Sequence, residues 1–321
     1  MSASGRLFAL SFESFGEVLV LIARLIADPA DLETRISDMQ RGLGAKKPGL
    51  LANLSLDRAQ VINHGLGVVE LHFSHDDPQI VFSAIEKHFG RCDALVSRRE
   101  IMVPQLFVSD MDSTMIGQEC IDELADYAGL KPEIAAITER AMQGELDFES
   151  ALLERVRLLE GLAENAIEAC LRERIHPTSG AKVLTQTLKA KGCRTVLVTG
   201  GFHHFADRVA EWLGFERVVG NRLQVRGGRL TGALDGAITD ASTKESVLRE
   251  EAAGIGPDAK TLATGDGAND IPMLQTADYG FAYCAKPKAK AAANGRIDGP
   301  DLRAILTLLG VPQNEWTEDI V

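Results

Sequence analysis

Five short apolar runs, separated by helical patterns, are the sequence feature that most restricts how this chain can fold. The runs are 106–110 (LFVSD), 194–199 (RTVLVT), 217–220 (RVVG), 261–264 (TLAT) and 279–283 (YGFAY). Helical patterns between them end at Gly192 and Gly214, where a left-handed C-terminal cap is expected. Strands that alternate with helices in this way predict an α/β protein whose doubly wound parallel sheet lies between two layers of helices.

Two insertions are expected in this Rossmann-like core. Residues 115–179, after the first strand, carry four helical patterns, which is more than one crossover helix needs. They predict a helical cap over the edge of the sheet. After the third strand, residues 221–232 (NRLQVRGGRLTG) predict a short hairpin that turns at Gly227–Gly228.

The first hundred residues form a separate pattern. We expect 1–103 to be a small N-terminal α+β module of ferredoxin-like or ACT-like type, and 104–321 to be the second unit. The sequence predicts strands and helices in the module as follows: strands at 7–12 (LFALSF), 59–73 and 93–99, and helices at 18–27 (VLVLIARLIA), 30–43 and 78–90. No Gly/Ser-rich linker marks the boundary.

Composition excludes several classes of function. The formal net charge of −12, without a basic patch, argues against a nucleic-acid surface. The five cysteines are scattered and form no CxxC pair, which argues against a disulfide framework or a zinc site. The longest apolar run, 18–27, is about half a membrane span and contains Arg24. With no signal-peptide pattern at the start, we expect a cytoplasmic protein without a membrane partner.

Polar residues follow three of the predicted strands where each strand ends. Asp110 and Asp112 follow the first strand, Thr199 ends the second, and Asp266 follows the fourth. The carboxyl ends of parallel strands share one edge of a sheet, and ligands bind there. Two neighbouring carboxylates each raise the cost of ionising the other, so a cation is expected beside them.

Four motifs in order carry a resemblance to a known family. They are DMDST (110–114), VTGG (198–201), STKES (242–246) and TGDGANDIPML (264–274). Together they resemble the motifs of the haloacid dehalogenase superfamily of phosphatases and phosphotransferases. Within it, the insert that begins GQECIDELA looks like that of the phosphoserine phosphatases. The resemblance covers about 104–290 and implies hydrolysis of O-phospho-L-serine to L-serine and phosphate, the last step of serine synthesis.

The resemblance implies a division of labour between the acids. Asp110 would be the nucleophile that forms an aspartyl-phosphate, and Asp112 would be the general acid and base. Mg²⁺ would be held by the Asp110 carboxylate, the backbone carbonyl of Asp112 and Asp266.

The same resemblance assigns the phosphate site. The Thr199 hydroxyl and the Gly200 N–H would bind phosphate oxygens, and Lys244 would bridge nucleophile and phosphate. Asn269 and Asp270 would orient the phosphate and Lys244. The family often has serine where this chain has Thr199. The residues also permit simpler interpretations: Asp266 could belong to a plain turn, Asp270 could cap a helix, and Lys244 could be a surface lysine.

Cap residues point to the amino-acid end of a substrate. Arg155 has only apolar neighbours at helical spacing, whereas Arg157 has Glu154 and Glu160 within reach. We therefore expect Arg155 to bind the substrate carboxylate. Four cap residues are expected to contact substrate: Glu119 on its ammonium, Arg155 on its carboxylate, and Phe148 and Met142 as an apolar lid. Core packing is the alternative for Met142, and support from the helix dipole is the alternative for Glu119.

Other functions remain open on the sequence. The enzyme could act on another small amino phosphate or transfer the phosphoryl group to an acceptor. Residues 1–100 could bind a small ligand and make the protein a sensor. A P-type ion pump shares a TGDGAND-like motif but requires several membrane spans.

His203 and His204 are interpreted as structural. A homodimer is compatible with the sequence and is not predicted by it.

Overall fold

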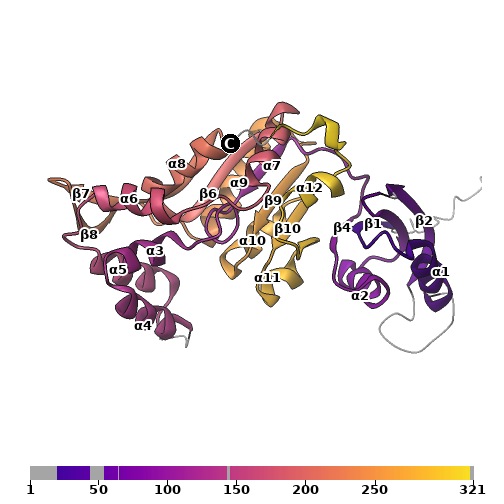
Figure 1. Ribbon diagram of the computed structural model, residues 1–321, viewed down its shortest axis with the longest axis horizontal. Helices are drawn as coiled ribbons and strands as arrows, with labels where there is room; N and C mark the ends of the chain where they lie inside the picture. Colours follow the sequence, from indigo (N-terminus) through magenta and orange to yellow (C-terminus); the bar gives the residue numbers. More distant parts are fainter. Residues whose placement is uncertain (1–19, 44–53, 64, 143–144, 319–321) are drawn as a thin grey trace, which may run out of the picture.

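One continuous sheet connects the two parts of the chain in the computed structural model, which describes residues 20–43, 54–63, 65–142 and 145–318. The strand order is β2 (Ser55–Asn63), β3 (Val68–Ser74), β1 (Val20–Ile26), β4 (Asp93–Ser97), β11 (Gly295–Ile297), β10 (Tyr279–Tyr283), β9 (Thr261–Gly265), β5 (Leu106–Ser109), β6 (Arg194–Phe202), β7 (Arg217–Arg226) and β8 (Arg229–Asp235). Figure 1 shows the small N-terminal part at one end and the cap at the other.

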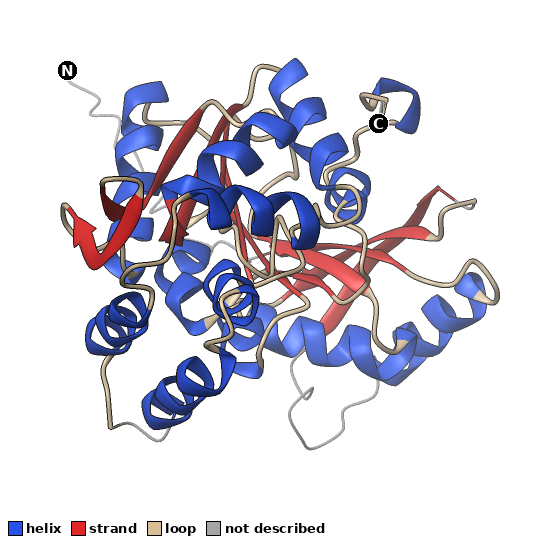
Figure 2. Cartoon of the chain, turned by 60° about the vertical axis from the view of Figure 1, so that its left-hand side comes forward, coloured by secondary structure: helices blue, strands red, loops and turns tan. Residues whose placement is uncertain are grey.

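The predicted doubly wound core is confirmed. Strands β11, β10, β9, β5, β6 and β7 are parallel neighbours. Three helices cover one face: α7 (Ala181–Ala190), α8 (His203–Leu213) and α12 (Arg303–Leu308). On the opposite face lie α9 (Ala241–Ile255) and α10 (Ile271–Thr276), and α11 (Pro287–Ala292) packs against α10. Figure 2 shows helices on both sides of the strands.

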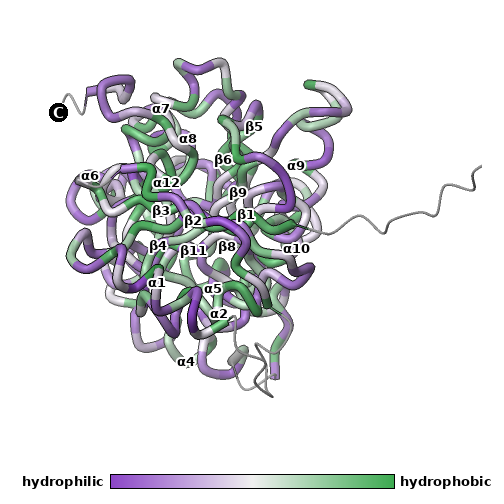
Figure 3. The backbone as a smooth tube through the Cα atoms, turned by 90° about the vertical axis from the view of Figure 1, so that its right-hand side faces the viewer, coloured by the Kyte–Doolittle hydropathy of each residue, from purple (hydrophilic) through white to green (hydrophobic). Residues whose placement is uncertain are grey.

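The alternation of side chains along β5 explains why both faces are covered. Phe107 packs with α7 and α8, while Leu106 and Val108 pack with α9 and α10, and all three are fully buried. A strand buried on both faces appears in the sequence as a continuous apolar run. Figure 3 shows polar stretches mainly toward the outside of the molecule. The expected helix ends are also confirmed, with φ of 82° at Gly192 and 92° at Gly214.

Four cap helices occupy the predicted insertion after β5. They are α3 (Cys120–Tyr127), α4 (Lys131–Met142), α5 (Phe148–Leu158) and α6 (Asn165–Arg174). The predicted hairpin is formed by β7 and β8, with φ of 59° at Gly227 and 71° at Gly228, as a type I′ turn requires. The third core strand and the first strand of the hairpin are both parts of β7, which pairs with β6 in its first half and with β8 in its second half. The hairpin joins the cap, because Ala163 and Arg229 form a bridge between them.

The N-terminal part has ferredoxin-like topology. Its elements follow the order β1, α1 (Leu32–Leu43), β2, β3, α2 (Pro78–Phe89), β4, and its strands are antiparallel in the spatial order β2-β3-β1-β4. The predicted helix at 18–27 is wrong, because Val20–Ile26 is strand β1. Leu21, Ala23 and Leu25 are buried on one face while the residues between them are more exposed, which is the period of a strand. The strand expected at 7–12 lies outside the described residues.

The module and the core meet edge to edge. β4 of the module pairs antiparallel with β11 of the core. The predicted boundary at 103–104 falls in the connection between β4 and β5. A side chain of β1 also contacts the core: the Arg24 guanidinium donates to the carbonyl of Leu308 in α12 at 3.3 Å. The division into two units remains a prediction. In the described segments, none of the helices combines the length and apolar character needed to cross a membrane.

Candidate active site

A cleft of about 1290 Å³ opens where the carboxyl ends of the core strands face the cap. The core contributes Asp110 and Asp112 after β5, Thr199 to Gly201 in β6, and Asp266 to Asn269 after β9. The cap contributes Glu119, Phe148 and Arg155, and the segment after β8 forms a further wall. The strand ends and the cap helices that the sequence singled out therefore meet at one cavity.

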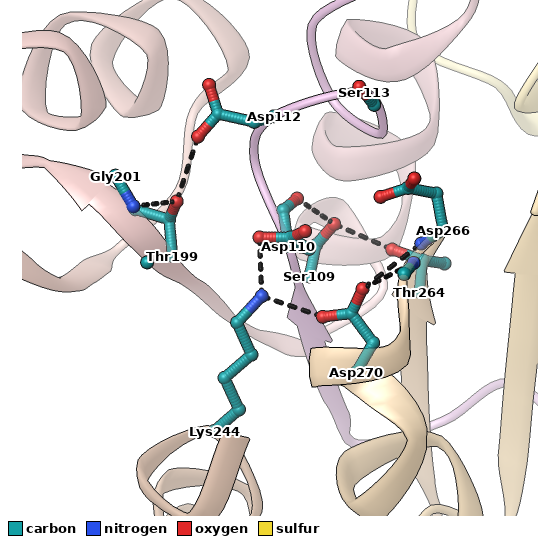
Figure 4. A network of polar contacts seen from close by, with 12 residues as sticks. Ser109, Asp110, Asp112, Ser113, Thr199, Gly201, Lys244, Thr264, Asp266 and Asp270 are labelled. Atoms are coloured by element: carbon teal, nitrogen blue, oxygen red, sulfur yellow. Dashed lines mark hydrogen bonds and ion pairs between the residues drawn. The ribbon is translucent and has the colours of Figure 1, made fainter. Parts of the chain in front are cut away.

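A buried lysine connects two of the core acids at the bottom of this site (Figure 4). Lys244 Nζ lies 2.7 Å from Asp110 Oδ1 and 2.7 Å from Asp270 Oδ1. Burial lowers the pKa of Lys244, but the ion pairs with Asp110 and Asp270 outweigh burial and raise this pKa above its usual range. Lys244 is in the first turn of α9, whose N-terminus Asp240 caps. The alternative that Lys244 is a surface lysine is therefore wrong.

Asp270 occupies the N-cap position of α10, but its side chain makes no capping hydrogen bond to that helix. Its Oδ2 accepts hydrogen bonds from the backbone N–H groups of Asp266 and Gly267, at 3.2 and 3.0 Å, and its other oxygen binds Lys244. Its carboxylate therefore holds the turn after β9 in place. Gly265 is required there, because a Cβ atom on it would lie 2.4 Å from Asp270 Cγ.

Asp112 has different partners from Asp110. Its Oδ1 accepts from the Cys120 N–H at 2.8 Å, and its Oδ2 accepts from the Thr199 hydroxyl at 3.2 Å. The same hydroxyl oxygen accepts from the Gly201 N–H at 2.9 Å. Burial raises the pKa of Asp112, and the bonds from Cys120 and Thr199 oppose that rise. The Thr199 hydroxyl, expected on phosphate, donates to Asp112 in this structure.

Three carboxylates are close enough to share a cation. One oxygen from each of Asp110, Asp266 and Asp270 lies within 4.8 Å of the other two. Burial, followed by the Asp270 carboxylate, raises the pKa of Asp110 well above its ordinary value, and Lys244 opposes this. Burial and Asp270 likewise raise the pKa of Asp266 to about 6. One lysine does not offset three acids, and an all-oxygen donor set suits Mg²⁺, so these residues fit the expected ion.

Glu119 lies at the cap side of the same cleft. It precedes α3, and its Oε1 accepts from the Ser113 hydroxyl at 2.8 Å. It stands at the N-cap position of α3, but its side chain makes no capping hydrogen bond to that helix. Although the residue is exposed to the cleft, the surrounding protein and the Asp112 carboxylate raise the pKa of Glu119 to about 7.

Arg155 is half-buried in the cleft without a carboxylate partner among the described residues. Its Nε donates to the Ala151 carbonyl at 3.2 Å. Burial lowers its pKa, and the charges of Asp122 and Glu119 act against this. In the described part of the chain, Arg157 forms no ion pair with Glu154 or Glu160, its expected partners. Glu154 pairs instead with Arg140 at 2.8 Å. Both arginines line the cleft.

Phe148 reaches from the cap to the phosphate loop. The residue is 42% exposed, and a Cβ atom placed on Gly200 would lie 3.4 Å from Phe148 Cζ. The side chain thus lies over Gly200 at the mouth of the site, as expected for a lid.

Met142 is the last residue of α4, and its side chain lies outside the described part of the structure. His203 begins α8 and contacts Asp207 at 2.8 Å, away from the cleft.

Sequence reasoning missed several contributors. Asp270 was expected to orient Lys244, but its membership of the acidic cluster was not expected, and its spacing of four residues from Asp266 around a tight turn was the available signal. Gly201 and Lys286 line the cleft as well. Nothing in the sequence pointed to Lys286, whose backbone N–H donates to the Asp266 carbonyl at 3.0 Å. Asn269 lines the cleft as expected.

Comparisons with known proteins agree with this geometry. A phosphoserine phosphatase from Archaeoglobus fulgidus is 45% identical over 210 residues, which is 65% of this chain and 60% of that protein. A solved HAD family hydrolase from Salmonella enterica superposes with a TM-score of 0.74 at 25% identity, covering 91% of this chain and 99% of the other. A phosphoserine phosphatase solved as a phospho-aspartyl intermediate analogue superposes with a TM-score of 0.59 at 40% identity, over 64% of this chain and 98% of its own.

The match to a family profile covers the region that builds the site. Residues 107–275 match the haloacid dehalogenase-like hydrolases, a segment that contains both acids after β5, the whole cap, Lys244 and the acidic turn after β9. The chain therefore belongs to the haloacid dehalogenase-like hydrolase family.

Proposed function

We propose that the protein is a Mg²⁺-dependent phosphoserine phosphatase, which hydrolyses O-phospho-L-serine to L-serine and inorganic phosphate. The observation that carries this proposal is the different bonding of two neighbouring carboxylates: Asp110 binds Lys244, whereas Asp112 binds Thr199 and Cys120. Acids in different environments can hold different protonation states, and this reaction needs one ionised and one protonated carboxyl group.

The reaction would proceed in two steps. In the first, an Asp110 carboxylate oxygen attacks phosphorus, the bond from phosphorus to the serine oxygen breaks, and Asp112 donates its proton to that oxygen. In the second, Asp112 takes a proton from water, the water oxygen attacks phosphorus, and the bond to Asp110 breaks. Inorganic phosphate leaves and both carboxyl groups return to their starting states.

Charge on the phosphoryl oxygens has to be neutralised in both steps. Lys244 contributes a fixed positive charge beside Asp110. Asp110, Asp266 and Asp270 would hold the metal, with the backbone carbonyl of Asp112 as the further ligand that the family resemblance implies. When bound, Mg²⁺ would supply charge neutralisation and fix the orientation of the phosphoryl group. Asn269 and the Gly200 N–H remain the proposed phosphate contacts.

The cap supports an amino-acid substrate. Glu119 and Arg155 both line the cleft, and Arg155 has no carboxylate partner among the described residues. The ammonium of the substrate would bind Glu119 and its carboxylate would bind Arg155, since a guanidinium group binds carboxylates with two parallel hydrogen bonds. Phe148 would cover the bound ester and exclude water. This role would place the enzyme in serine synthesis, and we expect it to act in the cytoplasm.

The test is phosphate release from L-phosphoserine, with and without Mg²⁺, beside a panel of phosphomonoesters. The panel includes D-phosphoserine, phosphothreonine and an ester without amino or carboxylate groups. The highest kcat/KM on L-phosphoserine, dependent on metal, is the expected result. A higher value on another amino phosphate, or transfer to an added alcohol, would replace serine as the substrate. Calorimetry of the full chain with amino acids tests whether residues 1–100 bind a ligand.

A further inference from the structure

A buried amide lies directly behind the phosphate loop and is assigned to no step of the reaction. Asn221 is in β7, is 1% exposed and does not line the cleft. Its Nδ2 donates to the Gly200 carbonyl at 2.7 Å, and its Oδ1 accepts from the Thr239 N–H at 2.9 Å. Because a carbonyl oxygen only accepts and a backbone N–H only donates, these two partners determine the orientation of the amide.

The position of Asn221 follows from an interruption of the sheet. β6 and β7 pair at Val198 with Val219 and next at Phe202 with Asn221. Three residues of β6, 199–201, therefore face a single residue of β7, Gly220, and bulge out of the ladder. A bulge of this kind redirects backbone groups away from the neighbouring strand. The side chain of Asn221 provides the hydrogen bond that the Gly200 carbonyl would otherwise receive from a ladder partner.

One peptide group transmits this contact to the reacting carboxyl group. The Gly200 carbonyl and the Gly201 N–H belong to the same planar peptide unit. Asn221 binds the carbonyl, and the N–H donates to Thr199 Oγ1 at 2.9 Å. The Thr199 hydroxyl then donates to Asp112 Oδ2 at 3.2 Å, as Figure 4 shows. Rotation of that peptide plane would displace the Gly201 N–H. The Thr199 hydroxyl group, which accepts from this N–H, would then move together with the proton that it donates to Asp112.

The other end of the amide holds the segment that leads into the lysine helix. Thr239 is 4% exposed and directly precedes Asp240, which caps α9 by accepting a hydrogen bond from the Thr243 N–H at 2.8 Å. Lys244 is in the first turn of that helix. A single side chain thus connects the loop beside Asp112 to the start of the helix that presents Lys244 to Asp110.

We propose that Asn221 is a positioning residue, which orients the Gly200–Gly201 peptide so that Thr199 holds Asp112 in place for proton transfer to the leaving group. The role assigned to Asp112 rests on the proposed function. The effect of losing Asn221 should depend on how much the leaving oxygen needs a proton, because only an ester with a basic leaving group relies on general acid catalysis.

The experiment compares two esters in purified full-length variants. Asn221→Asp keeps the acceptor for Thr239 and removes the donor to Gly200. In kcat/KM, which reports on phosphoryl transfer, we expect a loss of roughly 30-fold or more on phosphoserine, which is part of the roughly 10²–10⁴-fold that general acid catalysis contributes, and about 3-fold or less on p-nitrophenyl phosphate. If this variant does not fold, Asn221→Ser is measured on the same two esters with the same expectation.

Asn294→Asp is the matched control. Asn294 also joins segments through its amide, accepting from the Gly280 N–H at 2.7 Å and donating to the Val96 and Asp278 carbonyls. It directly precedes β11, which lies between β4 and β10 in the sheet, and it does not line the cleft. We expect it to change the melting temperature while the ratio of the two kcat/KM values stays at the wild-type value.

Two results would overturn the proposal: equal losses on both esters in the Asn221 variants, which would indicate general support of the loop, or no loss on phosphoserine. If the wild-type enzyme prefers another alkyl phosphate, that ester replaces phosphoserine in the comparison. Failure of the proposed substrate is in this way separated from failure of the role assigned to Asn221.

Discussion

Lys244 Nζ and Asp110 Oδ1 form an ion pair of 2.7 Å in which the two side chains are only 1% and 6% exposed. Asp270 binds the same ammonium group at the same distance. One cation between two buried acids, with Asp266 close by, leaves the cluster negatively charged. This pair therefore supplies a carboxylate oriented for attack, and the remaining charge provides a reason for a metal to bind.

Asp110→Asn should abolish turnover and leave the protein folded. The amide lacks a nucleophilic carboxylate oxygen, while Lys244 retains its partner Asp270. Phosphate release measures the first part of this prediction, and circular dichroism with a thermal melt measures the second. Substantial turnover by a well-folded, purified variant would show that another group attacks phosphorus.

Arg155→Ala should weaken binding of phosphoserine by roughly 2–5 kcal/mol, as is typical when one partner of a buried charge pair is removed. An ester without a carboxylate should bind nearly as it does to the wild type. Binding constants from competition with each ester measure both. Arg157→Ala is the comparison, since Arg157 lines the same cleft from the same helix. Equal losses on both esters would identify Arg155 as structural.

Mg²⁺ should stabilise the folded protein through the acidic cluster. An ion present at about 100 times its Kd adds about 2.7 kcal/mol to the free energy of unfolding. The melting temperature should rise with Mg²⁺, and chelation should remove both this rise and the turnover. Asp266→Asn should lose the rise, whereas Glu149→Gln, an exposed acid of α5 in the same cleft, should keep it. An unchanged rise in Asp266→Asn would place the ion elsewhere.

Glu119 should make substrate binding depend on pH. Its pKa is raised to about 7, so its ionised fraction, which binds the ammonium, grows as pH rises through 7. We expect KM for phosphoserine to fall over that range and KM for an ester without an amino group to stay nearly constant. Profiles of KM from pH 5.5 to 8.5 measure this. Glu119→Gln should remove the difference between the two esters.

The same pKa has an opposite consequence for stability. The folded value of about 7 lies above the unfolded value of about 4.3, so the folded state holds the proton more tightly. The stabilisation is present at low pH and is lost as pH rises from about 4.3 through 7. In urea unfolding of the metal-free protein, stability should decline less steeply over this range for Glu119→Gln than for wild type. An identical slope would contradict the raised pKa.

Gly201→Ala should impair catalysis more than Gly200→Ala. A Cβ atom on Gly201 would lie 2.7 Å from Asp112 Oδ2 and 3.1 Å from Thr199 Oγ1, so the acid would have to move. On Gly200 the nearest atom is Phe148 Cζ at 3.4 Å, on a ring that can turn aside. A displacement of about 1 Å can cost roughly 100-fold in rate. Values of kcat for the two variants provide the test, and a greater loss in Gly200→Ala would contradict it.

Much of the core could be predicted because its patterns are local. A strand buried on both faces has to be apolar throughout, and a left-handed helix end favours glycine, as at Gly192 and Gly214. The error at 18–27 has the same origin. A short apolar run is compatible with a buried helix or a strand, and only pairing with β3 and β4 decided in favour of β1.

Partners of charged residues were less predictable. Glu154 was expected near Arg157 by helix spacing, yet it pairs with Arg140 from the neighbouring helix α4. An exposed ion pair contributes little free energy, so the packing of the two cap helices decides which pair forms.

By itself, the sequence determined the α/β class of the core, the insertion of a helical cap and the set of acids after the strands, because periodicity and strand-end motifs depend on residues close together in the chain. Only the tertiary structure decided that Asp270 joins Asp110 around Lys244, that Thr199 binds Asp112, and that Asn221 holds the loop between them. These contacts join residues 21 to 134 positions apart, and such separations along the chain are bridged by the packing of the sheet and not by any local pattern.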